Sequence, residues 1–174
     1  QRAEDAWKVI RSITKDSVTT LGFSDGGFSA LKFASLYPEA VKKLIVIGVA
    51  DKPTEPSAKK FDYSVEGLMK YDSAFFSNRL KLMPEPGRWA ECLSKLNKMY
   101  NDDPVSKETF EKIKCPVLVM SGDRDSYNSL ESVVICARAI PGSELSIIPG
   151  CDHVVFFCNF PAVWEALKPF LQIN

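Results

Sequence analysis

The chain has 174 residues, 45% of them hydrophobic, so it is long enough to bury a core and is expected to form one globular domain. Its 22 lysine and arginine residues balance 22 acidic residues, which leaves no overall field for holding nucleic acid or an anionic membrane. No run in the sequence approaches the roughly 20 apolar residues of a membrane-spanning helix. We therefore expect a cytoplasmic protein with neither a nucleic-acid nor a membrane partner.

Short apolar runs alternate with segments of helical pattern, which is typical of parallel strands joined by crossover helices. In chain order we expect a helix over 2–14, a strand over 18–21, a helix from 27 that Pro38 ends, and a strand over 44–49. After a long interruption, the expected elements are a strand over 117–120, a helix around 130–137, a strand over 145–148 and a final helix over 161–170. The fold class is therefore α/β, with a mostly parallel sheet and helices on both faces.

Residues 52–110 break this alternation. They contain segments of helical character, such as 89–100, but no convincing strand, and the prolines that punctuate them are Pro53, Pro56, Pro84, Pro86 and Pro104. We expect a core over 1–51, a helical cap insertion over 52–110, and a second part of the core over 111–174. Helices inserted between two core strands are well placed to cover a pocket; the alternative is a surface excursion unrelated to function.

The strand over 18–21 runs directly into Gly22-Phe23-Ser24-Asp25-Gly26, which is the G-x-S-x-G pattern of a nucleophile elbow. A serine on a sharp strand-to-helix turn needs small neighbours, because a Cβ there would collide with the backbone as the chain reverses. We expect Gly22 and Gly26 to supply that room. The alternative is a glycine-rich turn with an idle serine.

A serine hydroxyl needs a base to take its proton, and the base needs a third group to hold its tautomer. His153 is the only histidine and follows the strand over 145–148. Asp123 and Asp125 follow the strand over 117–120, and Asp51 follows the strand over 44–49, so each is a candidate acid. Asp152 is too close in sequence to His153 to orient it easily. Because ligand chemistry gathers at the carboxyl ends of parallel strands, we expect serine, acid and histidine to meet at one edge of the sheet.

The five cysteines are odd in number and irregularly spaced, without a C-x-x-C pair. This argues against a disulfide framework and against a structural zinc site, so we expect reduced and mostly buried thiols. A catalytic or metal-binding pair of Cys151 with His153 is the alternative, because the two lie two residues apart.

Several motifs together resemble the α/β-hydrolases of the esterase and peptidase type, and most of all the biphenyl-hydrolase-like or valacyclovir-hydrolase-like members. These motifs are the elbow over 21–27, Tyr37-Pro38 followed by 43–46, and the segments 113–119, 122–125 and 150–153. The resemblance covers nearly the whole chain and corresponds to the carboxyl-terminal two thirds of the fold. It implies a triad of Ser24, His153 and Asp125, the fourth residue of the family's Gly-x-x-Asp pattern, with Asp123 and Asp51 as runner-up acids. It implies neither a cofactor nor a metal.

The resemblance implies hydrolysis of a small carboxylic ester or amide through an acyl-serine intermediate. The backbone N–H of Asp25 would stabilise the oxyanion, and Phe23 and Asp25 would contact the substrate. An acidic residue at the position of Asp25 resembles a clamp for an ammonium group, which suggests amino-acid esters. The alternatives are cleavage of a carbon–carbon bond or thioester, and a non-catalytic binding module or inactive fragment.

Members of this family carry further amino-terminal strands and a loop with a second oxyanion donor. We therefore expect the strand over 18–21 to be an exposed edge and the chain to be a fragment. The expected partner is the remaining amino-terminal portion of the fold or a second copy of the chain.

Overall fold

The computed structural model describes residues 1–52 and 62–173, which form two compact units. One unit comprises Gln1–Lys52 and Val105–Asn174 and contains the sheet; the other comprises Pro53–Pro104. Among its described residues, the second unit holds helices α3 (Val65–Leu82) and α4 (Trp89–Asp102), with a 3-10 turn over Pro86–Arg88 between them. Pro53 and Pro56, which we expected to punctuate the insertion, lie outside the described residues.

The expected insertion boundary at residue 110 needs correction. Val105 is 5% exposed and Phe110, at the end of the short helix α5 (Lys107–Phe110), is completely buried in the core of the sheet-containing unit. An antiparallel bridge between Lys52 and Val105 closes the base of the intervening segment. The core therefore resumes at Val105. That the second unit serves as a cap remains a prediction.

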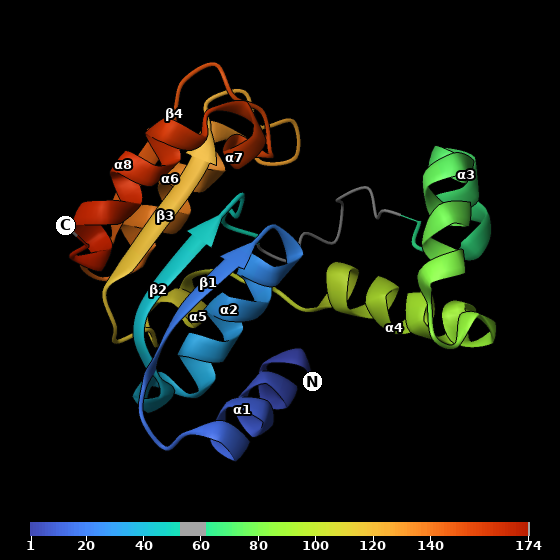
Figure 1. The fold of residues 1–174 in the computed structure, drawn as a ribbon, viewed down its shortest axis with the longest axis horizontal. Helices are drawn as coiled ribbons and strands as arrows, with labels where there is room; N and C mark the ends of the chain where they lie inside the picture. Colours follow the sequence, from blue (N-terminus) through green and yellow to red (C-terminus); the bar gives the residue numbers. More distant parts are fainter. Residues whose placement is uncertain (53–61, 174) are drawn as a thin grey trace. The chain divides into compact units, whose positions relative to one another are not determined.

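The sheet has four strands in the order β1 (Val18–Phe23), β2 (Val41–Ile47), β3 (Val117–Gly122) and β4 (Glu144–Ile148), all parallel (Figure 1). This confirms the expected α/β class. The register pairs the last residues of neighbouring strands, Phe23 with Ile47 and Gly122 with Ile148. The loops that follow the strands therefore emerge at the same edge of the sheet, which is the edge where ligand chemistry gathers in such sheets.

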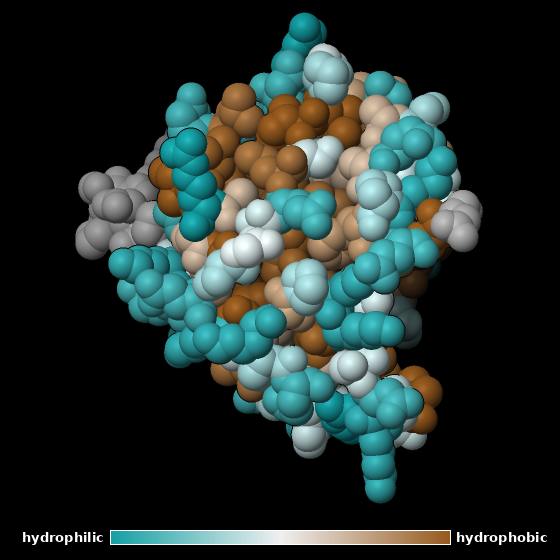
Figure 2. Space-filling view, turned by 90° about the vertical axis from the view of Figure 1, so that its left-hand side faces the viewer, coloured by the Kyte–Doolittle hydropathy of each residue, from teal (hydrophilic) through white to brown (hydrophobic). Residues whose placement is uncertain are grey.

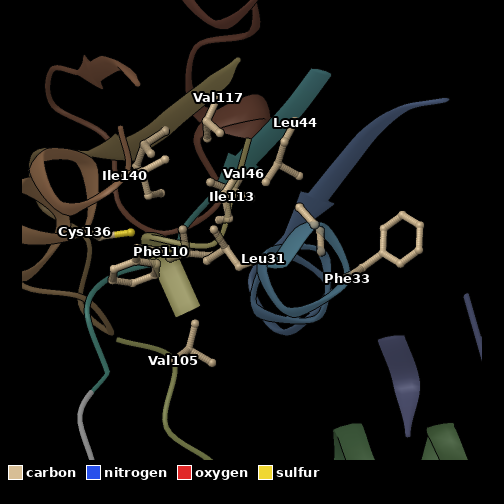
Figure 3. Packing of buried hydrophobic residues seen from close by; sticks show 14 of the residues in the cluster. Leu31, Phe33, Leu44, Val46, Val105, Phe110, Ile113, Val117, Cys136 and Ile140 are labelled. Atoms are coloured by element: carbon tan, nitrogen blue, oxygen red, sulfur yellow. The ribbon is translucent and has the colours of Figure 1, made fainter. Parts of the chain in front are cut away.

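Alternate residues of the central strands enter two separate hydrophobic clusters, one on each face of the sheet. Leu44 and Val46 of β2 pack in the larger cluster with α1 (Arg2–Ile13), α2 (Asp25–Leu36), α5 and α6 (Leu130–Ala139), part of which Figure 3 shows. Ile45 and Ile47 pack on the opposite face with α7 (Val155–Cys158) and α8 (Phe160–Leu171). Burial on both faces explains why residues 44–47 of β2 and 117–120 of β3 are apolar without alternation.

The strand β1 lies at one edge of the sheet, as expected. Leu21 of β1 is paired with Ile45, so its side chain lies on the face that α7 and α8 cover over the inner strands, yet it is 55% exposed. Figure 2 shows that apolar residues reach the surface over a broad area of one side of the molecule. Within the described part of the chain, no helix has the length and apolar character needed to cross a membrane.

The structure shifts several element boundaries. The strand β1 continues through Gly22 to Phe23, and α2 begins at Asp25 rather than Gly27, so Ser24 alone forms the junction between strand and helix. A 3-10 turn over Pro38–Ala40 follows α2, and β2 begins at Val41, three residues before the expected start. The sequence pattern did not reveal α5 and α7, since each is only four residues long.

Candidate active site

Ser24 has the backbone conformation of a strained strand-to-helix junction. Its φ of 52° and ψ of −120° are unusual for a residue with a side chain, and such a conformation costs of order 1–3 kcal/mol. The surrounding hydrogen bonds hold it: the Ser24 N–H donates to the Ile47 carbonyl at 2.8 Å, and the Ser24 carbonyl accepts from Gly27 N at 2.9 Å. This junction lies at the carboxyl edge of the sheet.

The glycines around Ser24 differ in what they contribute. A Cβ on Gly22 would collide with the backbone of Gly26 and Gly27, and a Cβ on Gly27 would collide with the Val49 side chain. A Cβ on Gly26, by contrast, would meet nothing within 4 Å. The expectation that Gly22 and Gly26 both provide room is therefore wrong for Gly26. The absence of a Cβ at Gly22 lets β1 approach the first turn of α2, and its absence at Gly27 leaves room for the Val49 side chain.

Ser24, His153 and Asp125 form one hydrogen-bonded chain. The Ser24 Oγ lies 2.8 Å from His153 Nε2, and His153 Nδ1 lies 3.0 Å and 2.9 Å from the two carboxylate oxygens of Asp125. The Asp125 side chain is completely buried and the His153 side chain is 12% exposed. An ionised carboxylate only accepts hydrogen bonds, so Nδ1 carries the proton and Nε2 is left to accept the Ser24 hydroxyl proton. This is the arrangement of a nucleophile, a base and an orienting acid.

Several neutral donors surround the Asp125 carboxylate. Oδ1 accepts from the backbone N–H groups of Tyr127 and Asn128 at 2.9 and 3.0 Å, and Oδ2 accepts from Ser121 Oγ and Asn128 Nδ2 at 3.2 and 3.1 Å. Burial acts to raise the pKa of Asp125, but the hydrogen bonds from His153, Asn128 and Tyr127 outweigh it, so the pKa lies below its ordinary value. The acid is therefore charged at neutral pH despite its burial.

Sequence reasoning did not identify Ser121, Asn128 or Gly48 as part of this site. Asn128 Nδ2 also donates to the Gly48 carbonyl at 3.2 Å, which ties the acid loop to the end of β2. Gly48 has a φ of 67°, and a Cβ there would lie 2.8 Å from His153 Cε1. A glycine directly after a buried strand is the one signal that could have marked this position.

The chain is similar to known hydrolases. A Haemophilus influenzae protein assigned to the esterases or lipases is 28% identical over 193 residues, which covers 99% of this chain and 66% of that protein. The mouse serine hydrolase BPHL is 22% identical over 177 residues, covering 98% of this chain and 60% of BPHL. The crystal structure of an enol-lactonase from Burkholderia xenovorans superposes with a TM-score of 0.73 at 17% identity, covering 98% of this chain and 71% of that one. No protein-family model matches the chain.

The chain has the α/β-hydrolase fold. It spans about two thirds or less of the length of the two relatives. In this fold the nucleophilic serine comes first along the chain, the acid second and the histidine third. Ser24, Asp125 and His153 have that order.

Of the three candidate acids, Asp125 differs from Asp123 and Asp51 in its contact with His153. The Asp123 side chain is exposed, and its backbone N–H donates to the Ile148 carbonyl at the end of β4. Asp51 lies beside α6, with its N–H bonded to the Ser132 carbonyl, and burial together with the charge of Glu108 raises its pKa. His153 Nδ1 is bonded to Asp125.

Asp25 and Phe23 flank the nucleophile. The Asp25 N–H is the first of α2, at the positive end of that helix, and a first-turn N–H has no acceptor within the helix. The Asp25 carboxylate forms an ion pair with Arg2 of α1, so a substrate ammonium group would have to compete with Arg2. The Phe23 ring lies 5.0 Å from the His153 ring and 4.9 Å from that of Phe156.

The expectation of reduced thiols is wrong for two of the five cysteines. Cys151 and Cys158 form a disulfide, because the turn after β4 and the short helix α7 bring their Cα atoms to 5.7 Å despite irregular cysteine spacing. The alternative pairing of Cys151 with His153 is excluded by this bond. Cys92 is exposed, and Cys115 and Cys136 are buried thiols, as expected. Over residues 1–52 and 62–173, no group of three or more metal-ligating side chains is arranged to hold an ion.

Proposed function

We propose that the protein is a serine hydrolase that cleaves small carboxylic esters or amides through an acyl-serine intermediate. The observation that carries the proposal is the hydrogen-bonded chain from Ser24 through His153 to the buried, charged Asp125. The kinship with esterases and serine hydrolases supports the same reaction class.

The positions of these atoms support the following reaction. Ser24 Oγ attacks the carbonyl carbon while His153 Nε2 takes the hydroxyl proton, and Asp125 stabilises the imidazolium that forms. The Asp25 N–H donates to the carbonyl oxygen as it becomes negative. His153 then gives the proton to the leaving alcohol or amine. A water molecule, deprotonated by His153, attacks the acyl-serine carbonyl; as the bond to Ser24 Oγ breaks, His153 returns that proton to the serine oxygen and the acid is released.

Aromatic rings near His153 favour small apolar acyl or alcohol groups. Besides Phe23 and Phe156, the Tyr127 ring lies 4.8 Å from the His153 ring and its side chain is 71% exposed. Rings with open surface beside a nucleophile offer an apolar contact for a substrate. A clamp for the ammonium group of amino-acid esters at Asp25 belongs to the same proposal, with the condition that the substrate displaces Arg2 from the carboxylate.

A fluorophosphonate probe tests the proposal, because it reacts with a serine that a histidine activates. We expect labelling of Ser24 in the unmodified chain and its loss in Ser24→Ala and His153→Ala. Ser35→Ala, which removes another serine hydroxyl of α2, is the matched control and should label at the unmodified rate. An unlabelled Ser24 in the folded chain would overturn the proposed hydrolysis and favour a non-catalytic binding module.

A second measurement separates the bond types. Incubation with a p-nitrophenyl ester, a thioester and a carbon–carbon substrate with a vinylogous 1,5-diketone should release product fastest from the oxygen ester. Faster cleavage of the carbon–carbon bond or the thioester would contradict the proposed substrate class while leaving the role of Ser24 intact.

A further inference from the structure

The Asp152 carboxylate bridges the two loops that carry the base and the acid. Its Oδ1 atom accepts the Ser126 N–H at 2.8 Å and the N–H of the adjacent His153 at 2.7 Å. Ser126 directly follows Asp125. A single oxygen therefore joins the backbone of the residue next to the acid to the backbone of His153. We propose that Asp152 is a positioning residue that holds His153 at hydrogen-bonding distance from Asp125. The inference rests on the proposed function.

Asp152 is too close to His153 in sequence to contact its imidazole ring easily. Its carboxylate contacts the main chain of His153 instead. Because Oδ1 accepts the N–H of its own neighbour, the backbone of His153 is held in one orientation before its ring begins. The same oxygen accepts the N–H of Ser126, 26 positions before Asp152, so the side chain connects the loop after β4 to the loop after β3. An aspartate reaches both N–H groups with one short side chain.

Other contacts between the two loops lie further from the reacting groups. The Arg124 N–H donates to the Cys151 carbonyl at 3.0 Å, and the Asp123 N–H donates to the Ile148 carbonyl at 3.2 Å. A Cβ on Gly122 would collide with the Cys151 carbonyl, so the backbones approach closely at that point. These contacts fix the loops where they leave the sheet. The Asp152 bridge acts at Ser126 and His153, where the distance between base and acid is set.

The chemistry of Asp152 suits a holding role. The side chain lies at the surface, so its loss opens no cavity in the core. The N–H groups of Ser126 and His153, together with the Ser126 hydroxyl, hold the pKa of Asp152 below its ordinary value. The carboxylate is therefore ionised at neutral pH, and hydrogen bonds from backbone N–H groups to an ionised oxygen are stronger than those to a neutral one.

Asp152→Ala tests the bridge through the rate of acylation. Misplacement of a catalytic group by about 1 Å costs up to about 100-fold in rate, so we expect kcat and the rate of fluorophosphonate labelling to fall by about 10- to 100-fold. KM should change less than about 2-fold, because substrate contacts are unaffected. Asp152→Asn keeps an oxygen acceptor and should recover most of the lost rate. Glu144→Ala, which removes an exposed carboxylate at the other end of β4, is the control for lost charge.

A proton resonance gives a readout that does not depend on activity. His153 is the only histidine in the chain, so a downfield imidazole N–H signal belongs to this residue, and the hydrogen bond to Asp125 assigns it to the Nδ1 proton. In the unmodified chain the hydrogen bond to Asp125 should protect this proton from exchange with water. We expect exchange at least about 10-fold faster in Asp152→Ala and near the unmodified rate in Asp152→Asn and Glu144→Ala.

The outcomes separate the two proposals. Equal labelling and equal proton exchange in Asp152→Ala and the unmodified chain would overturn the positioning role, whatever the substrate. An unmodified chain that fails to label would overturn the proposed function, and the proton exchange would still decide whether Asp152 holds His153.

Discussion

Replacement of Gly48 by alanine should damage the site more than it damages the fold. Gly48 has a φ of 67°, where a residue with a Cβ costs about 1–2 kcal/mol relative to glycine. The new Cβ would also lie 2.8 Å from His153 Cε1 and 3.1 Å from His153 Nδ1. To reach ordinary contact at 3.4 Å, the imidazole ring must move by about 0.6 Å, which disturbs the 2.8 Å contact between its Nε2 and the Ser24 hydroxyl. We expect a loss of about 10- to 100-fold in kcat.

Gly142→Ala is the matched control for this experiment. Gly142 has a φ of 68°, almost the same as Gly48, but a Cβ there would meet nothing within 4 Å. Urea unfolding should give Gly142→Ala a loss of about 1–2 kcal/mol and Gly48→Ala at least as much, whereas ester hydrolysis and fluorophosphonate labelling should slow only in Gly48→Ala. Equal activity in the two variants would refute the reasoning, because backbone strain alone would then account for everything that Gly48 contributes.

Three further predictions concern the cysteines, the acid and the residue after the nucleophile. Iodoacetamide should label Cys92 alone in the folded chain, because Cys115 and Cys136 are buried and burial raises the pKa of Cys136 to about 12; denaturation should add these two, and denaturation with a reductant should add Cys151 and Cys158, as counted by intact mass. Any other order of labelling contradicts the assignment. The pKa of Asp125 is lower in the folded chain than the ordinary value of 3.8, so its contribution to stability is complete above pH 3.8 and is lost as the pH falls further. The free energy of urea unfolding of Asp125→Asn should therefore lie below that of the unmodified chain near neutral pH and approach it in acid, and a gap independent of pH would count against the ionised carboxylate. Arg2→Ala should raise the rate on an alanyl ester relative to an acetyl ester, and Asp25→Asn should lower the rate on the alanyl ester alone; equal changes on both esters would remove the ammonium clamp.

Sequence patterns located the elements that carry the site because those patterns arise from local chemistry. Apolar runs without alternation marked β2 and β3, since both faces of these strands are covered. The alternation of strands and helices implied parallel pairing, and parallel pairing brings the loops after β1, β3 and β4 to one edge. The meeting of Ser24, Asp125 and His153 followed from this topology and from the resemblance to α/β-hydrolases.

Patterns could not find contacts between residues distant in sequence. Asn128 reaches both Asp125 and Gly48, 80 residues earlier, and no local spacing signals that pair. The Cys151–Cys158 disulfide was missed because an irregular set of five cysteines predicts no framework, whereas this bond depends on how the turn after β4 and helix α7 bring the two Cα atoms together. The insertion boundary was misplaced because prolines mark local breaks, whereas the burial of Phe110 depends on the helices packed around it.

The sequence by itself indicated the class of the fold, a nucleophile elbow at Ser24 and His153 as the candidate base, because the chain has one histidine and one G-x-S-x-G motif after a predicted strand. The resemblance to a family favoured Asp125 over Asp123 and Asp51, and the tertiary structure shows that Asp125 faces the imidazole. Only the tertiary structure shows that Gly48 leaves room for the ring and that Asp152 ties the two loops through backbone N–H groups. The physical reason is distance. Residue type and periodicity are encoded along the chain, but a hydrogen bond between loops requires positions within about 3 Å, which only the packing of the sheet and its helices sets.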